Sequence, residues 1–265
     1  MTSLSHDRLC AEITTQSELL RACVQGSDLT APVPSCPGWN LGQLLTHLGE
    51  AHRWADEIVR TKAVQPPSDR ALRDLSPVSG AGPEGTGAWL ADGAERLAAT
   101  LREAGPDAKL WSPVSGADGR TGFYARRMAH ETLIHRADAT LAVGTEFTAG
   151  EEVAVDAFDE WLELGSLPQL FDIHPEQREL LGPGRTLHFH ATDTGPQARA
   201  AWLVDLTGET VVWRRAHEKA AVAVRGPLTE LLLVLYRRRS PHSEGIEVLG
   251  DGQLLDFWQE RVGFG

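Results

Sequence analysis

The chain has few cysteines and no long hydrophobic run. Its 265 residues include three cysteines, Cys10, Cys23 and Cys36, all within the first forty positions. An odd number with no paired framework disfavours a disulfide-stabilised secreted protein, so we expect a reduced, cytoplasmic protein. No basic segment followed by an apolar stretch opens the chain, and no stretch is long enough to span a bilayer. We therefore expect neither a signal peptide nor a membrane partner.

Basic residues are also scarce compared with acidic ones. The chain has 25 lysines and arginines against 37 aspartates and glutamates, and its formal net charge is −12. Nucleic acids and anionic membranes attract basic surfaces, so this balance disfavours both as partners. The hydrophobic fraction of 42% is ordinary for a globular protein. We expect a monomer or homodimer.

Apolar residues recur at helical spacing through the first two thirds of the chain. Residues 30–39 contain three prolines and a glycine, which indicates an ordered loop. Asn40 and Gln43 after it have the spacing of a capping box. A longer polar stretch, residues 62–83, is also expected to be a loop. The pattern predicts helices over residues 5–26, 41–61, 84–104, 121–143 and 151–164.

After about residue 175 the apolar spacing changes to the two-residue alternation of strands. The pattern predicts strands over residues 185–191, 202–206, 210–215, 220–225 and 246–249, with helices over 228–238 and 253–262. We therefore expect an α+β fold. It comprises an N-terminal helical bundle over residues 1–170 and a smaller C-terminal domain of antiparallel sheet and helices over 171–265. The linker is expected near residues 167–182.

The helix predicted over residues 121–143 carries a carboxylate and an imidazole four residues apart. Each helical residue turns by about 100°, so Glu131 and His135 share a face, and Asp138 returns to it. Such a pair can share a divalent cation, but it also occurs as an exposed pair that stabilises a helix. Asp138 is either a group that orients His135, a base near the metal, or a surface acid. His130 is five residues from His135 and points elsewhere.

A catalytic zinc site needs a third protein ligand and an open coordination position. His47 is the best candidate, because it interrupts the apolar helical pattern of residues 44–48. The alternative is a core histidine that is satisfied by a hydrogen bond. Glu50 is a possible substitute ligand. His52 lies on another face of the same predicted helix, and we expect it to be in solvent.

Three further groups have both a chemical and a structural interpretation. Cys36 precedes a helix and is either a thiolate nucleophile or a loop residue packed beside Trp39. His188 and His190 share one strand face and either chelate a metal or form the polar face of a half-buried strand. The arginines at 237–239 end a predicted helix, where cations suit the helix dipole; one of them could instead reach an anionic substrate.

Taken together, several motifs resemble a known family. Residues 34–41 (PSCPGWNL) and 44–48 (LLTHL), followed by the pattern Glu131-x-x-x-His135-x-x-Asp138, resemble the mycothiol-dependent maleylpyruvate isomerase family. That family belongs to the DinB-like metal-dependent superfamily. Residues 224–233 and 246–251 are similar to its C-terminal domain, so the resemblance extends over nearly the whole chain.

The resemblance implies a DinB-like four-helix bundle that holds a divalent cation, usually zinc. Matched residue by residue, the implied metal ligands are His47, Glu131 and His135. Arg238 matches a basic position after the leucine-rich helix, and we take it as a candidate catalytic residue together with Asp138. Arg237 stands where many relatives have glycine, so the backbone around Arg238 is expected to differ from theirs.

The resemblance also implies a chemistry based on a low-molecular-weight thiol, mycothiol, held as a nucleophilic thiolate. The thiolate can add to a small electrophile such as maleylpyruvate and leave after bond rotation, which is cis–trans isomerisation. It can instead remain attached, which is S-transfer. The same site could also activate water for hydrolysis. Two non-catalytic alternatives remain: a zinc-stabilised binding or regulatory module, and a bundle that has lost its metal and scaffolds a partner.

Overall fold

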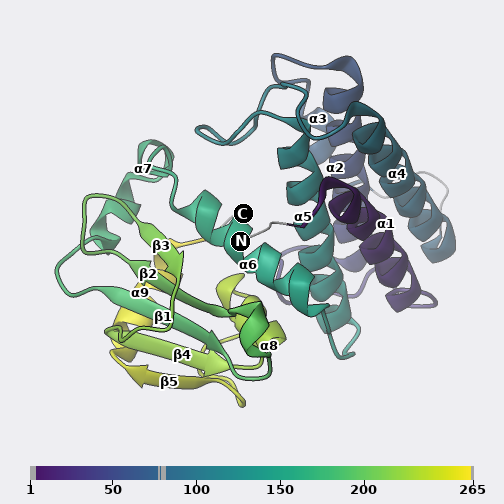
Figure 1. Cartoon of the computed structure of the whole chain (residues 1–265). Coiled ribbons are helices and arrows are strands. Elements are labelled where there is room, and N and C mark those ends of the chain that lie inside the picture. Colours follow the sequence, from purple (N-terminus) through teal and green to yellow (C-terminus); the bar gives the residue numbers. More distant parts are fainter. Residues whose placement is uncertain (1–3, 77, 79–81, 264–265) are drawn as a thin grey trace. The chain divides into compact units, whose positions relative to one another are not determined.

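The computed structural model of the chain describes residues 4–76, 78 and 82–263. Contacts divide the chain into two compact units, Met1–Phe147 and Thr148–Gly265 (Figure 1). The division lies before helix α6 (Glu151–Gly165), whereas the sequence pattern placed the boundary near residue 170. Helix α6 is grouped with the sheet because Phe158 stacks on Trp202 of the sheet, with ring centres 3.9 Å apart.

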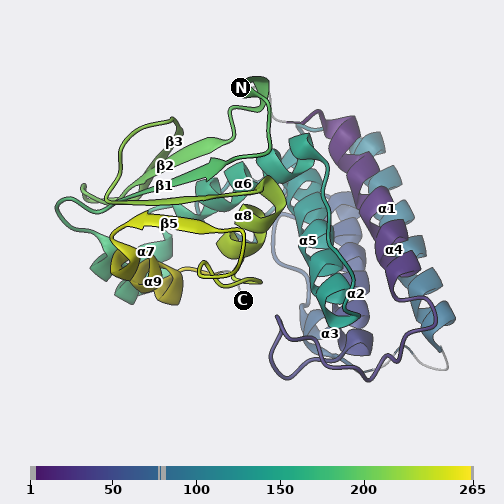
Figure 2. The same cartoon turned by 90° about the horizontal axis from the view of Figure 1, so that it is seen from below.

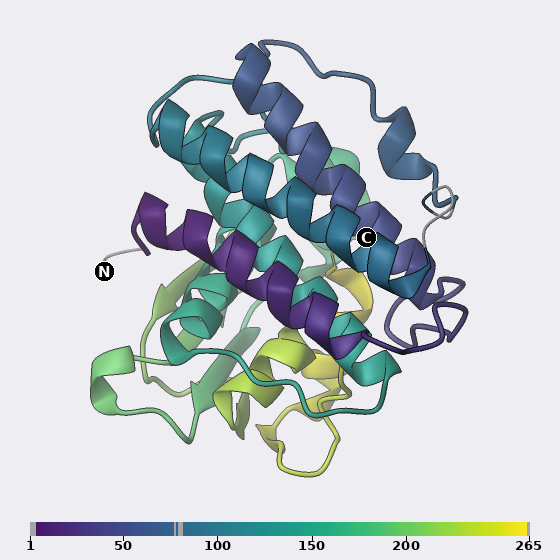
Figure 3. The ribbon, with the colours of Figure 1, turned by 90° about the vertical axis from the view of Figure 1, so that its right-hand side faces the viewer.

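The first unit is a bundle of long helices, as the helical spacing predicts. Helix α1 (His6–Cys23) packs against α4 (Pro83–Ala104) and α5 (Thr121–Ala142), and α2 (Leu41–Thr61) packs against the same two helices (Figures 2 and 3). A short helix, α3 (Arg70–Arg73), lies in the segment predicted as a loop. Part of that loop, at positions 77 and 79–81, lies outside the described residues.

The start of α2 is fixed by the predicted capping box. The side chain of Asn40 accepts a hydrogen bond from the backbone of Gln43 at 2.9 Å, and the Gln43 side chain accepts one from the backbone of Asn40 at 3.0 Å. These bonds satisfy backbone donors that a helix leaves unpaired at its first turn. Because the helix starts at a defined residue, the direction in which His47 points is also defined.

Two apolar clusters lie at different levels of the bundle. Leu44 of α2 and Ala139 of α5 belong to one cluster, and Ile58 and Tyr124 belong to the other. Between these levels lie buried polar residues, among them His52 of α2 and His135 and Asp138 of α5. The bundle therefore holds a polar layer within an apolar core, and this layer contains the candidate site.

The second unit contains a five-stranded sheet with strand order β3-β2-β1-β4-β5 (Figure 1). All neighbouring strands are antiparallel except β1 and β4, which are parallel. The strands are β1 (Thr186–Ala191), β2 (Ala201–Asp205), β3 (Val212–Arg215), β4 (Val222–Gly226) and β5 (Glu247–Gly250). The other helices of this unit are α7 (Leu170–Ile173), η1 (Pro175–Leu180), η2 (Pro196–Ala198), α8 (Leu228–Leu235) and α9 (Gly252–Arg261).

One face of the sheet is covered by helices. Phe189 of β1 contacts Phe158 of α6 and Trp258 of α9, and helix α8 packs against β1 and β4. His188 and His190, which flank Phe189 in β1, point to the opposite face, because side chains alternate along a strand. The α+β class is confirmed. In the described part of the chain, no helix combines the length and the apolar content needed to cross a bilayer.

Candidate metal centre

Helix α5 places three polar side chains on one face, as their spacing predicts. Nε2 of His135 lies 3.1 Å from Oε1 of Glu131, and its Nδ1 lies 2.8 Å from Oδ2 of Asp138. His135 is 6% exposed and Asp138 is fully buried, so Asp138 is not a surface acid. The imidazole of His135 is therefore held between two carboxylates, one at each ring nitrogen.

Helix α2 brings His47 to the same place. The rings of His47 and His135 are perpendicular, with centres 5.4 Å apart, and the ring of Trp39 also packs against His47, with centres 4.9 Å apart. One ligand atom from each of His47, Glu131 and His135 lies within 4.8 Å of the other two. The structure thus gathers the three residues implied as metal ligands.

Two observations show that these residues fit a divalent cation. Nδ1 of His47 is buried and has no hydrogen-bond partner, which is costly for a polar atom unless something binds it. Burial lowers the pKa of His47, and nearby His135 lowers it further, against a smaller opposing effect of Glu131. A neutral imidazole is the form that binds a metal, and two imidazoles with one carboxylate are a common zinc donor set.

The charges around His135 also favour a cation in this place. Burial alone would lower the pKa of His135, but hydrogen bonds to Asp138 and Glu131, together with their charges, raise it to about 9. Burial opposes the charge of Glu131 too, yet the guanidinium of Arg127 and the His135 ring hold the pKa of Glu131 well below its usual range. A cation at Nε2 of His135 would take the place of the proton that these carboxylates attract.

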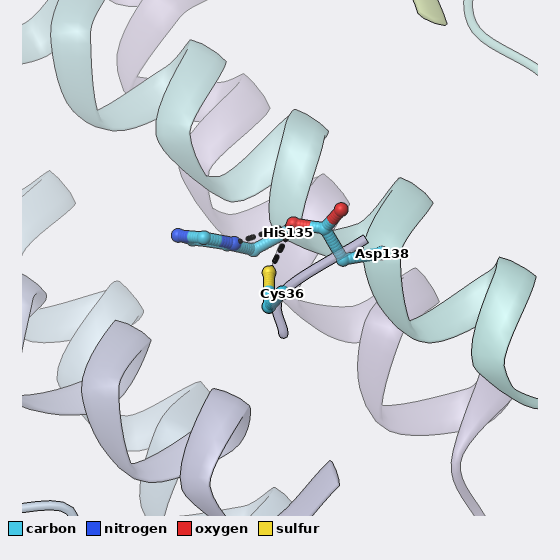
Figure 4. A group of neighbouring side chains, drawn as sticks. All are labelled: Cys36, His135 and Asp138. Atoms are coloured by element: carbon cyan, nitrogen blue, oxygen red, sulfur yellow. Dashed lines mark hydrogen bonds and ion pairs between the residues drawn. The ribbon is translucent and has the colours of Figure 1, made fainter. Parts of the chain in front are cut away.

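Cys36, His135 and Asp138 form a second set of ligand atoms within 4.8 Å of one another (Figure 4). Here the polar atoms already bind one another, because Oδ2 of Asp138 accepts hydrogen bonds from Nδ1 of His135 and from Sγ of Cys36 at 3.5 Å. A cation in this set would displace both hydrogen bonds. His47 has no such bond to lose at Nδ1, which favours the Nε2 side of His135.

Three other residues considered from the sequence do not join His47. Glu50 and His130 are absent from both converging sets of described residues. His52 was expected in solvent, and this prediction is wrong: the residue is fully buried. Its Nε2 lies 2.8 Å from Oγ1 of Thr132, which itself donates to the carbonyl of Met128, so His52 is the donor. Helix α2 is covered by both α4 and α5, so its buried face is wider than its apolar stripe suggests.

Arg238 belongs to the second unit. Helix α8 ends at Leu235, three residues before its predicted end, and Arg237 takes a left-handed conformation with φ of 61°. Glycine adopts this conformation at little cost, which accounts for the glycine expected here in relatives. Arg238 lines an open polar hollow together with Arg237 and Arg239, and its Nη1 donates to the backbone of Tyr236 at 2.8 Å.

Two residues of the site were missed from the sequence. Nη2 of Arg127 donates to Oε2 of Glu131 at 2.7 Å, and the spacing of four residues on one helix was a signal that could have found this pair. Oγ of Ser35 donates to Oδ1 of Asp138 at 2.6 Å. No local pattern connects Ser35 with Asp138, since 103 residues separate them.

Comparisons with known proteins show a similarity over both units of the chain. The family model for the mycothiol maleylpyruvate isomerase N-terminal domain matches residues 10–140, and the MDMPI C-terminal domain model matches residues 152–257. A crystal structure of the mycothiol-dependent maleylpyruvate isomerase is 15% identical and has a TM-score of 0.59, covering 94% of this chain and 95% of that one. A histidine-to-alanine mutant of that enzyme gives a TM-score of 0.60 with the same identity and coverage.

At this level of identity the two crystal structures show a shared fold. None of the curated proteins compared with the chain matches it. The two family models together span both units of the chain, from the bundle with the candidate metal centre to the sheet and its helices. The chain therefore belongs to the mycothiol-dependent maleylpyruvate isomerase family.

Proposed function

We propose that the chain is an enzyme that uses a divalent cation, preferably zinc, and the thiol mycothiol to isomerise a small electrophilic alkene such as maleylpyruvate. The observation that carries the proposal is the convergence of His47, Glu131 and His135 from two helices. Membership of the family supports the choice of thiol and of substrate class. We expect the protein to act on small molecules in the cytoplasm.

The cation would lower the pKa of a thiol brought to it and so supply a thiolate at neutral pH. The side chains prepare the place for it. His47 and His135 offer ring nitrogens, and Glu131 offers Oε1, while Arg127 binds Oε2 and limits rotation of that carboxylate. Asp138 holds the proton at Nδ1 of His135, so a cation would bind at Nε2, where it would replace the proton shared with Glu131.

The number of ligands supports a catalytic site over a structural one. Among the described residues, three side chains converge as possible ligands on the Nε2 side of His135, namely those of His47, Glu131 and His135 itself. Structural zinc sites close with four protein ligands, whereas catalytic sites keep one position for substrate. An open position suits an incoming sulfur atom, and this argues against a purely zinc-stabilised binding module.

The proposed reaction needs no net consumption of thiol. The thiolate adds to the alkene, so that a C–S bond forms and the π electrons move through the conjugated carbonyl to its oxygen. Rotation about the resulting single bond follows. The electrons then return, the double bond re-forms in the trans geometry, and the thiolate leaves. S-transfer shares the addition step and differs only in that the C–S bond persists after the carbon takes up a proton.

The substrate carboxylates and the developing negative charge need cationic partners. Arg238 is our candidate, because it matches a basic position of the family and lines a polar hollow, which it shares with Arg237 and Arg239 and with the acidic residues Asp256 and Glu260. A guanidinium can bind a carboxylate through two parallel hydrogen bonds, which orients the substrate as well as holding it. Asp138 acts through His135 in this proposal and is a positioning residue.

The test is turnover of maleylpyruvate with and without mycothiol, after loading the protein with zinc. We expect thiol-dependent formation of the trans product by the unchanged protein. His47→Ala should reduce the rate at least a hundredfold, whereas His242→Ala, at an exposed histidine of the second unit, should not. Consumption of one thiol per product would indicate S-transfer. Loss of maleylpyruvate without thiol, and without formation of the trans isomer, would indicate hydrolysis. No turnover with any thiol would contradict the proposal.

A further inference from the structure

The sheet face opposite the helices carries a second group of histidines. His188 and His190 lie two residues apart on β1, and His217 comes from the connection between β3 and β4. The ring centres of His190 and His217 are 4.5 Å apart, those of His188 and His217 are 5.1 Å apart, and those of His188 and His190 are 5.9 Å apart. All three belong to the second unit, and none of them is a candidate ligand of the metal centre at His47, Glu131 and His135.

The three rings differ in their access to solvent. His188 is 4% exposed, and its Nε2 is buried without a hydrogen-bond partner. His190 is half-buried and His217 is exposed. An unsatisfied buried nitrogen costs about 1–3 kcal/mol, so its presence needs a reason. The arrangement therefore places one buried, unpartnered nitrogen beside one half-buried ring and one exposed ring.

The surroundings keep the two imidazoles of β1, those of His188 and His190, in the neutral form that binds a metal. Burial lowers the pKa of His188 to about 4, and the neighbouring histidines contribute to this shift. Burial and His217 also lower the pKa of His190. The charged residues around the group are paired with one another, Arg225 with Glu247 at 3.0 Å and Arg214 with Glu218 at 2.7 Å.

We propose that His188, His190 and His217 form a second metal site, which takes a divalent transition-metal ion of the zinc and copper class. Three imidazoles on a tetrahedral ion, with bonds of about 2.0 Å, have ring centres roughly 5 Å apart. The observed separations of 4.5 to 5.9 Å lie on both sides of this value. A donor set of nitrogen atoms selects zinc, copper or nickel over magnesium and calcium, which prefer oxygen.

Binding requires rotation of the rings. The converging ligand sets of the described residues lie at the candidate metal centre, so the nitrogens of this triad do not yet point to one place. His217 is exposed and lies in a connection between strands, which leaves its side chain free to turn. The ion would give the buried Nε2 of His188 the partner that the protein does not supply.

The experiment counts zinc bound by the full chain in equilibrium dialysis at pH 7.5. His190→Gln and His217→Gln alter the two accessible ligands and avoid the buried His188. We expect each variant to bind one zinc equivalent fewer than the unchanged protein, or to bind it at least tenfold more weakly. His242→Gln is the matched control and should bind as the unchanged protein does. His47→Ala would remove the zinc ion of the candidate metal centre and leave the one at the histidine triad. The failure of this proposal can therefore be distinguished from the failure of the proposed function.

Nuclear magnetic resonance of the histidine rings provides the second readout. Zinc should shift the ring signals of His188, His190 and His217 together in the unchanged protein. Equal zinc binding by all the cluster variants and the control would overturn the proposal. A shift of His190 and His217 without His188 would also overturn it, because it would show a two-ligand surface site that leaves the buried nitrogen unused.

Discussion

Nδ1 of His135 lies 2.8 Å from Oδ2 of Asp138, and this carboxylate is fully buried. Asp138 also accepts hydrogen bonds from Ser35 and Cys36, in the loop that precedes α2. An ionised carboxylate only accepts, so Nδ1 of His135 carries a proton that Asp138 holds in place, and a cation at Nε2 would replace the proton that Nε2 shares with Glu131. One carboxylate therefore sets the tautomer of His135 and ties the loop before α2 to helix α5.

Asp138→Asn is expected to weaken zinc binding about 10- to 100-fold, because the amide cannot provide the same charge behind His135. Turnover should fall with it. The measurement is zinc affinity by competition with a chelator of known affinity. Asp256→Asn makes the same chemical change at an exposed carboxylate that binds His242, and it should leave zinc affinity unchanged. Equal affinities of the two variants would refute the role of Asp138.

His52 should make the protein less stable in acid. Burial lowers its pKa to about 3 in the folded state, from the ordinary value of 6.5. Below pH 6.5 the unfolded chain binds a proton at His52 that the folded protein excludes, so the free energy of unfolding falls as the pH drops toward 3. The loss is at most about 1.4 kcal/mol per pH unit, and His52 has no such effect above pH 6.5.

His52→Gln tests this dependence, because the amide can still donate a hydrogen bond to Thr132 but does not titrate. Urea unfolding of both proteins at pH 4.5, 5.5 and 7.0 gives the slope of stability with pH. Between pH 4.5 and 5.5, the free energy of unfolding of the variant should change less steeply with pH than that of the unchanged protein. The difference in slope should correspond to the uptake of up to one proton on unfolding. Identical slopes would mean that His52 takes up a proton in the folded state.

Asp159 should be important for the stability of the second unit. Its Oδ1 accepts hydrogen bonds from Trp202 at 2.8 Å and from Nε of Arg215 at 2.9 Å, and both ionic partners are only 12% exposed. Asp159→Ala leaves a nearly buried guanidinium without its partner, which should cost about 3–5 kcal/mol. Chemical unfolding followed by tryptophan fluorescence would measure the loss.

The matched control for Asp159 is Glu218→Ala, which breaks an exposed ion pair with Arg214 and should change stability little. A large loss in the Asp159 variant, with little in the control, would show that α6 is held to the sheet as one folded unit. Similar stabilities of the two variants would contradict this packing.

Arg238→Ala should raise the KM for an anionic substrate about 10- to 100-fold, since a hydrogen bond to a charged group is worth about 1.5–3 kcal/mol. The KM for the thiol should stay the same. Steady-state kinetics with each substrate varied in turn separates the two effects. Arg225→Ala, at an arginine paired with Glu247, is the control. An unchanged KM for the anionic substrate would exclude Arg238 from its binding.

Local patterns predicted the features that depend on neighbouring residues. Asn40 and Gln43 form the expected capping box, and Glu131, His135 and Asp138 share the expected face, because both arrangements follow from helix geometry alone. Strands over residues 202–206 and 210–215 were also predicted from the two-residue alternation, and they form the neighbouring strands β2 and β3. These features needed no knowledge of what packs against each helix or strand.

Features that depend on distant residues could not be predicted in the same way. The burial of His52 results from two helices that cover α2 and from Thr132, eighty residues away. The parallel pairing of β1 with β4 requires a crossover that no local pattern records. His217 joins His188 and His190 only because the connection between β3 and β4 returns to their face of the sheet.

The most direct test of the account is the zinc content of His47→Ala compared with the unchanged protein, each dialysed against the same zinc buffer. His47→Ala should contain one zinc equivalent fewer, with the fold retained by circular dichroism, because the three-ligand centre loses one of its nitrogens. His242→Ala should contain as much zinc as the unchanged protein. Equal zinc content in all three proteins would contradict a metal centre at His47, Glu131 and His135.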